Sequence, residues 1–283
     1  MLRRPSRLTT LAATLIVVAS LIVSNEQPSA RRRLAPVFEF GNGLELEVHG
    51  LVSPAPGGTV VLALHGCCGD RRDLAPLGRA LAGTGATVAV PDVRPFRGGG
   101  GWPATYIDAM CAYSWTRRVA DEAGASVAVI GWGDGALVAA TIALGWPELA
   151  PTATGCLTEP PAAGPELVLG LSGHYGWIGE PPLVTAALID WFGAGPEQDP
   201  TAWRWGNPGW WLDHTSVRPS FMLIGGTDDV ASDEFAAALT NRGFDAVHTR
   251  IEDTDGLNII QPRAGPGSSA FDAIIGALDA AAH

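Results

Sequence analysis

Runs of consecutive hydrophobic residues recur along the chain and alternate with stretches in which hydrophobic residues return every three or four positions. A short continuous hydrophobic run is typical of a strand buried on both faces of a sheet. The helical spacing is typical of a helix that packs one side against such a sheet. The runs that predict strands are residues 59–64, 87–90, 126–130, 166–171, 220–224 and 246–251. The stretches that predict helices are residues 72–82, 104–123, 136–144, 231–239 and 269–281.

Ahead of these elements, residues 37–52 alternate hydrophobic and polar positions around Gly41, Asn42 and Gly43, which predicts a β-hairpin. Strands that alternate with helices at this spacing form right-handed crossovers, and therefore a mostly parallel sheet with helices on both faces. The predicted fold class is α/β, a doubly wound sheet with an antiparallel N-terminal edge. Residues 174–215 have no clean period.

The first 33 residues have the pattern of a targeting segment. Arg3, Arg4 and Arg7 precede a hydrophobic run at residues 8–23, as in a signal peptide or signal anchor. The run is longer than most signal hydrophobic regions and shorter than the about 20 residues of a membrane span. We expect an extracytoplasmic protein, secreted or anchored by this segment, with one domain over residues 34–283.

The charge balance restricts the partners of that domain. The chain has a formal net charge of −11, and six of its 18 basic residues lie in the first 33 positions beside a single acid. The remaining domain is therefore about five charges more negative than the whole chain. Such a surface repels phosphate backbones, so we expect no nucleic-acid partner and membrane contact only through the N-terminal segment.

Three predicted strands end in sequences with chemical content, at the edge of a parallel sheet where sites form. HGCCGD at residues 65–70 follows the first buried strand, GWGDG at 131–135 follows the third, and GGTDDV at 225–230 follows the fifth. GWGDG matches the G-x-S-x-G nucleophile elbow in spacing and in its strand–turn–helix context. HGCCGD resembles the oxyanion loop of esterases, and residues 253–262 resemble a loop that carries a catalytic histidine.

These motifs follow one another in the order of the α/β-hydrolase superfamily, and the chain resembles its carboxylesterases and dienelactone hydrolases over essentially the whole domain. The resemblance implies an α/β-hydrolase fold and hydrolysis of carboxylic esters without a cofactor or a metal. It implies that Asp229 is the triad acid, and that backbone amides of Cys67 and Asp134 form the oxyanion hole.

Two positions depart from the family pattern. Gly133 stands where the nucleophile belongs, and Gly256 stands where the alignment places the histidine. Glycine has no atom that attacks a carbonyl and no ring that carries a proton. The sequence therefore predicts a degenerate triad that retains only Asp229.

Other side chains are weaker candidates for the missing nucleophile. Asp134 follows the nucleophile position by one residue, where the side chain usually turns away from the site. Ser172 lies in a second elbow-like sequence, GLSGH, but a serine at a strand end more often caps its own loop. We expect His65 to hold the oxyanion loop and His248 to be structural, and His214 has no obvious partner in the sequence.

The four cysteines permit a disulfide outside the cell. Cys67 or Cys68 is a candidate partner for Cys111, since both ends of that pairing lie near the carboxyl edge of the predicted sheet. Cys156 follows a helix that runs away from this edge, and the sequence does not fix the pairing among Cys67, Cys68, Cys111 and Cys156.

Six tryptophans fall between residues 177 and 211, where members of the resembled family carry a lid over the active site. Trp177 and Trp132 are predicted to line an apolar cleft for a small hydrophobic or aromatic ligand. Ordinary packing of a long insertion explains the tryptophans equally well. Three functions follow from these observations: a non-catalytic binder, an ester hydrolase with an unusual nucleophile, or a purely structural domain at the cell surface.

Overall fold

The computed structural model describes residues 35–66, 68–95, 99–175, 182–227, 229–252 and 268–281. Residues from Pro36 onward form one compact unit. The predicted targeting segment lies outside the described residues and stays a prediction. Within the described residues, no helix has the length and hydropathy to span a bilayer.

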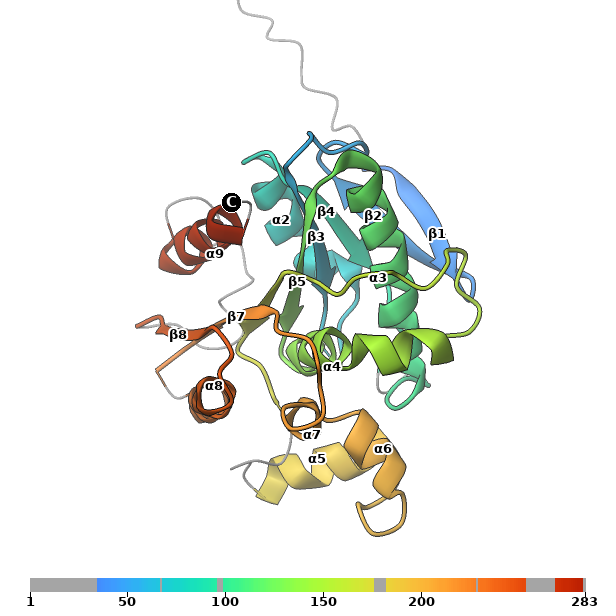
Figure 1. The fold of residues 1–283 in the computed structure, drawn as a ribbon, viewed down its shortest axis with the longest axis vertical. Helices are drawn as coiled ribbons and strands as arrows, with labels where there is room; N and C mark the ends of the chain where they lie inside the picture. Colours follow the sequence, from blue (N-terminus) through green and yellow to red (C-terminus); the bar gives the residue numbers. More distant parts are fainter. Residues whose placement is uncertain are drawn as a thin grey trace, which may run out of the picture. The chain divides into compact units, whose positions relative to one another are not determined.

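One mixed sheet runs through this unit (Figure 1). Its described strands lie in the order β1-β2-β4-β3-β5-β6-β7-β8. β2 pairs antiparallel with both β1 and β4, and every other neighbouring pair is parallel. The α/β fold class and the antiparallel N-terminal edge are therefore confirmed. The strands are β1 (Val37–Gly41), β2 (Leu44–His49), β3 (Thr59–Leu64), β4 (Thr87–Pro91), β5 (Ser126–Trp132), β6 (Leu167–Leu171), β7 (Ser220–Gly225) and β8 (Ala246–Arg250).

The opening hairpin turns at Asn42 and Gly43, whose φ angles are 54° and 71°. A two-residue turn with positive φ at both positions matches the right-handed twist of its strands, and Asn-Gly is the sequence that adopts it most readily. The central strands are hydrophobic throughout because both faces are covered, and every residue of β3 is buried. Local sequence therefore accounts for both the edge and the centre of the sheet.

Helices cover the two faces of the sheet (Figure 1). Side chains of α2 (Arg71–Ala82) and α9 (Ser269–Ala281) share one hydrophobic cluster with one face of the central strands. Side chains of α3 (Ala104–Ala123), α4 (Asp134–Leu149) and α8 (Val230–Asn241) share the other. This is the predicted doubly wound arrangement.

α4 is longer than the predicted 136–144 and continues through Gly145 and Pro147. Both are poor helix residues, which is why the sequence pattern predicted an earlier end. The tertiary structure explains the glycine. A Cβ built on Gly145 would lie 2.6 Å from Cε2 of Trp211. Gly145 therefore makes room for a tryptophan to pack against the helix. A short 3₁₀ helix, η2 (Ala150–Thr152), follows α4.

The segment without a clean period contains three helices, which the sequence pattern did not predict. They are α5 (Pro182–Phe192), α6 (Pro200–Trp205) and α7 (Pro208–Trp211). Asp199 and Asn207 cap the last two of these helices with their side chains. Trp191, Trp203 and Trp211 are buried in the core beneath. For these three tryptophans, core packing is the correct interpretation, while Trp177 lies outside the described residues.

The predicted disulfide is wrong. Cys111 on α3 is bonded to Cys156, and Cys68 is exposed. After η2 the chain turns back and forms an isolated bridge between Cys156 and Gly41 at the end of β1. This return brings Cys156 against α3, and a prediction from the direction of α4 alone could not include it. Cys67 lies outside the described residues.

Candidate functional site at the carboxyl ends of the strands

The turn between β5 and α4, which the sequence predicts to be the nucleophile elbow, is made at Gly133. Gly133 joins the strand to the helix with φ 56° and ψ −121°, which is a strained conformation for any residue with a side chain. Its N–H donates to the carbonyl of Leu171 at 3.0 Å, and its own carbonyl accepts from the N–H of Ala136 at 3.0 Å. A Cβ built on Gly133 would meet no atom of the described residues within 4 Å. As far as the described residues reach, the position therefore has space for a side chain and lacks one.

The glycines on either side of this position serve a different purpose. A Cβ built on Gly131 would overlap the backbone of Gly135, and one built on Gly135 would overlap the backbone of Leu64 and His65. The ends of β3 and β5 and the first turn of α4 lie too close to one another for a side chain at either glycine. The flanking glycines are needed by packing, whereas the central glycine satisfies only the backbone conformation.

The loop after β3 is held by His65, as predicted. The buried imidazole lies with Nδ1 2.9 Å from the carbonyl of Gly66, and Nε2 accepts from the N–H of Val93 at 3.3 Å. Since Nε2 accepts, Nδ1 carries the proton and donates to Gly66. The ring thereby joins the loop after β3 to the loop after β4. Cys67, whose amide was predicted for the oxyanion hole, lies outside the described residues.

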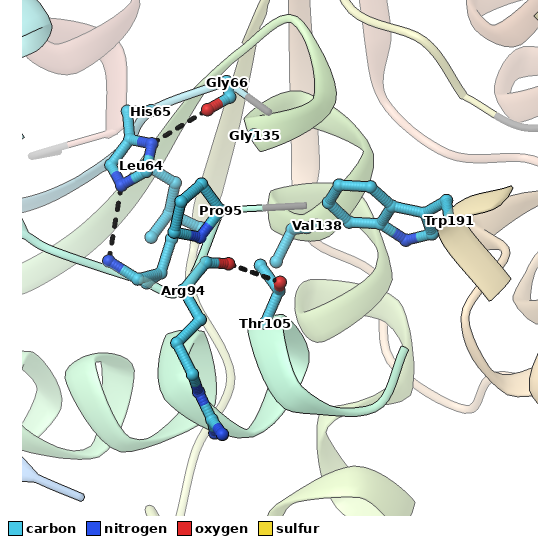
Figure 2. A pocket seen from close by; sticks show the side chains of 10 residues that line it. Leu64, His65, Gly66, Arg94, Pro95, Thr105, Gly135, Val138 and Trp191 are labelled. Carbon is cyan, nitrogen blue, oxygen red and sulfur yellow. Dashed lines mark hydrogen bonds between the residues drawn. The ribbon is translucent and has the colours of Figure 1, made fainter. Parts of the chain in front are cut away.

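A very small cavity lies behind this loop. Figure 2 shows it between His65, Pro95, Thr105, Val138 and Trp191. Its volume is about 10 Å³, which is room for no more than one water molecule. This cavity is therefore too small to hold an organic ligand.

Asp229 lies after β7, where the triad acid was predicted, and its carboxylate caps α8. One oxygen accepts from the N–H of Ser232 at 3.0 Å, and the other accepts from the hydroxyl of Ser232 at 2.8 Å. Both oxygens are thus used in holding the helix start. Gly256 and the whole predicted histidine loop lie outside the described residues, so the loss of the histidine stays a prediction.

The structure brings together two side chains that the sequence analysis did not pair. Nδ1 of His174 lies 2.9 Å from Oδ1 of Asp134, and the backbone N–H of His174 lies 3.5 Å from the carbonyl oxygen of Gly133. The Asp134 side chain was expected to turn away from the site. Trp132 pairs with Leu171 in adjacent strands, and residues just beyond a paired position come together. The sequence analysis did not consider this strand register, so it did not pair Asp134 with His174.

Ser172, the remaining candidate for the nucleophile, and Tyr175 both have buried hydroxyl groups. Burial raises the pKa of Tyr175, the residue after His174, well above its usual range, so its hydroxyl keeps its proton. Ser172 has a positive φ of 45° and a buried hydroxyl that makes no hydrogen bond to the described residues. Neither residue is a ready nucleophile.

The other histidines have local partners. His248 lies with Nδ1 2.5 Å from Oδ1 of Asp233 on α8, in agreement with a structural role. His214 stacks on Trp210, with ring centroids 3.9 Å apart. Among the described residues, no group of three or more His, Cys, Asp or Glu side chains is arranged to hold a metal ion.

Trp132, predicted to line the cleft, packs its ring near Gly66. A Cβ built on Gly66 would lie 3.4 Å from Cε3 of this indole. The ring is partly buried against the cluster formed with α2 and α9. Trp132 therefore supports the loop after β3 from the elbow side.

Comparison with known proteins identifies the fold. No family model matches the chain, and no curated protein matches it in sequence. Among solved structures, it is similar to esterase B from Lactobacillus rhamnosis, with a TM-score of 0.67, 16% identity, and coverage of 96% of this chain and 95% of that one. It is also similar to esterase 2 from Thermogutta terrifontis, with a TM-score of 0.60, 18% identity, and coverage of 88% and 92%.

A third similar structure is a bifunctional GH43-CE protein from Bacteroides eggerthii, with a TM-score of 0.63 and 14% identity over 85% of this chain and 33% of that one. At these identities the likeness defines the fold and nothing finer. The chain has the α/β-hydrolase fold, as its motifs and their order predicted.

Proposed function

We propose that this protein is an exported, non-catalytic member of the α/β-hydrolase fold that binds a small ligand or a partner at the carboxyl ends of its strands. The observation that carries the proposal is Gly133, which keeps the backbone geometry of an elbow while presenting no side chain to the open space. Loss of a triad serine costs about six orders of magnitude in turnover, or roughly 8 kcal/mol. That loss is too large for the remaining parts of an esterase site to offset.

The space at Gly133 supports the binding part of the proposal. A ligand that enters it meets the first turn of α4, whose backbone N–H groups and dipole favour an oxygen or a partial negative charge. A small hydrophobic or aromatic molecule with one polar oxygen fits these surroundings.

A chromogenic short-chain ester assay tests the proposal. Wild-type protein is expected to hydrolyse the ester no faster than buffer, and turnover far above that rate would overturn the proposal. Gly133→Ser is expected to fit without a clash, since no atom of the described residues lies within 4 Å of the new Cβ. A screen of aromatic acids and esters by thermal shift tests binding, because a ligand specific for the folded state raises Tm. Gly133→Trp, which fills the space, is expected to abolish that rise.

Slow ester hydrolysis is a second candidate, favoured by the pair of Asp134 and His174. In this reaction a water molecule takes the place of the absent hydroxyl. The imidazole accepts one proton from the water as its oxygen bonds to the ester carbonyl carbon, and it returns the proton to the departing alkoxide. Asp134 orients the ring through Nδ1.

Paired substitutions separate this candidate from the first. If the wild type turns over ester, His174→Gln is expected to reduce the rate by about 10²–10⁴-fold, the range for a positioned base, and Asp134→Asn to reduce it by a smaller factor. His214→Gln, at another exposed histidine, is the matched control and is expected to leave the rate unchanged. An activity that survives His174→Gln would exclude this mechanism.

A further inference from the structure

A second cavity lies between the first turns of α3, the end of α4 and helix α6. Its volume is about 260 Å³. This is slightly below the about 300–1,000 Å³ of pockets that take drug-sized ligands, so its occupant is a smaller molecule. The main side chains of this α3–α6 cavity are Trp102, Tyr106, Ile107, Met110, Leu149 and Trp205.

The lining is hydrophobic, and its hydroxyl groups are already used. Tyr106 donates its hydroxyl proton to the carbonyl of Gly206 at 2.7 Å, and Thr152 at the rim donates to the carbonyl of Leu149 at 2.7 Å. No charged side chain is among the described residues that line the cavity. A charged or strongly polar occupant would lose its hydration there without gaining partners.

The cavity adjoins the elbow region through a shared aromatic wall. Nε1 of Trp191 donates to the hydroxyl of Tyr106 at 3.1 Å, and the two rings meet edge to face. Trp191 also lines the small cavity shown in Figure 2. Tyr106 and Trp191 therefore lie between the two cavities. The small cavity lies beside the loop after β3, and the α3–α6 cavity, which is large enough for an organic molecule, lies on the other side of these two rings.

We propose that the α3–α6 cavity is a binding site for a small uncharged aromatic or branched aliphatic molecule. The indole rings of Trp102 and Trp205 suit an aromatic occupant, and Ile107 and Met110 suit any hydrophobic one. A peptide is a poorer occupant, because its backbone N–H and C=O groups would lie against the apolar wall unpaired. The site is independent of the proposed role of the elbow and goes beyond it.

Titration with N-phenyl-1-naphthylamine tests this site, because the emission of this uncharged dye rises when it leaves water. Thr152→Trp places a large ring at the exposed rim of the cavity without entering the core. Thr154→Trp is the matched control, since Thr154 is also exposed and does not line the cavity. We expect Thr152→Trp to weaken dye binding at least tenfold and Thr154→Trp to change it less than twofold, with both variants keeping the wild-type Tm.

Two further variants decide where the dye binds. Ile107→Trp fills the α3–α6 cavity from α3, and Gly133→Trp fills the space at the elbow. Binding lost in Thr152→Trp and Ile107→Trp but kept in Gly133→Trp supports the site. Binding lost only in Gly133→Trp overturns it and supports the elbow cleft instead. Binding unchanged in all three variants, or absent from the wild type, also overturns it.

Discussion

Arg94 and Asp108 form a bidentate ion pair that joins the loop after β4 to helix α3. The Arg94 side chain donates from Nε and Nη2 to the two carboxylate oxygens, both at 2.7 Å, and its backbone N–H adds a third bond at 3.0 Å. The carboxylate of Asp108 is fully buried. The hydrogen bonds that Arg94 donates to this carboxylate raise the pKa of the guanidinium above its usual value. Because Arg94 also lines the cavity beside the elbow, this pair positions one wall of the site.

Asp108→Asn is expected to lower the free energy of unfolding by about 2–3 kcal/mol. The substitution leaves Arg94 without its charged partner in a half-buried position, which costs less than in a fully buried one. Asp121→Asn is the matched control, because Asp121 also pairs with an arginine, Arg117, but is exposed. Its expected cost is below about 1 kcal/mol. Urea unfolding of the two variants checks the difference, and equal small losses would contradict it.

Gly133→Ala and Gly276→Ala are expected to change stability in opposite directions. Neither new Cβ meets an atom in the part of the chain that the structure describes within 4 Å, and of the two glycines only Gly133 has a positive φ. Alanine at Gly133 is therefore strained and should lower the free energy of unfolding by about 1–2 kcal/mol. Alanine at Gly276, inside α9, should raise it by about 0.5–1 kcal/mol. Chemical denaturation of both variants gives the comparison, and a neutral effect at Gly133 would mean that its backbone relaxes away from the elbow geometry.

Removal of the disulfide is expected to destabilise the fold strongly. The bond joins residues 45 positions apart, and a loop of this length corresponds to about 4 kcal/mol in the chain-entropy model. Cys111→Ala combined with Cys156→Ala should therefore lose about 2–4 kcal/mol. A reducing agent should lower the free energy of unfolding of the wild type by a similar amount and leave the double variant unaffected. If reduction has no effect on the wild type, the pairing is incorrect.

His49 is expected to make the fold less stable as the pH falls below about 6.5. Burial lowers its pKa, although Glu47 raises it and Arg79 on α2 lowers it further. The unfolded chain then binds a proton at a higher pH than the folded chain does, so acid favours unfolding. The neutral His49→Gln variant should lose less stability than the wild type between pH 7 and pH 5. Identical pH slopes by thermal denaturation would contradict this assignment.

Local pattern predicted most of the sheet and the helices against it, because a buried strand needs consecutive hydrophobic residues and a covering helix needs periodic ones. It missed the end of α4, where Gly145 and Pro147 disfavour a helix in isolation. It also missed α5, α6 and α7, whose buried tryptophans contact residues of several different segments and therefore leave no simple period in the sequence. The glycine in α4 is explained by the packing of Trp211 against Gly145, a contact that the local sequence pattern does not show.

The candidate site divides in the same way. The order of the motifs predicted the fold, the place of Gly133 in the turn and the place of Asp229 after β7. It could not pair Asp134 with His174 or Cys111 with Cys156, because these contacts join residues 40 and 45 positions apart. Nor could it show that Ser232 uses both oxygens of Asp229.

By itself the amino-acid sequence determined the α/β class, the Asn-Gly hairpin and the missing side chain at the elbow, since each depends on neighbouring residues alone. Only the tertiary structure decided which side chains meet, how much space surrounds Gly133 and where a larger cavity lies. Those properties depend on the distance between segments that are far apart along the chain, and side-chain packing sets that distance.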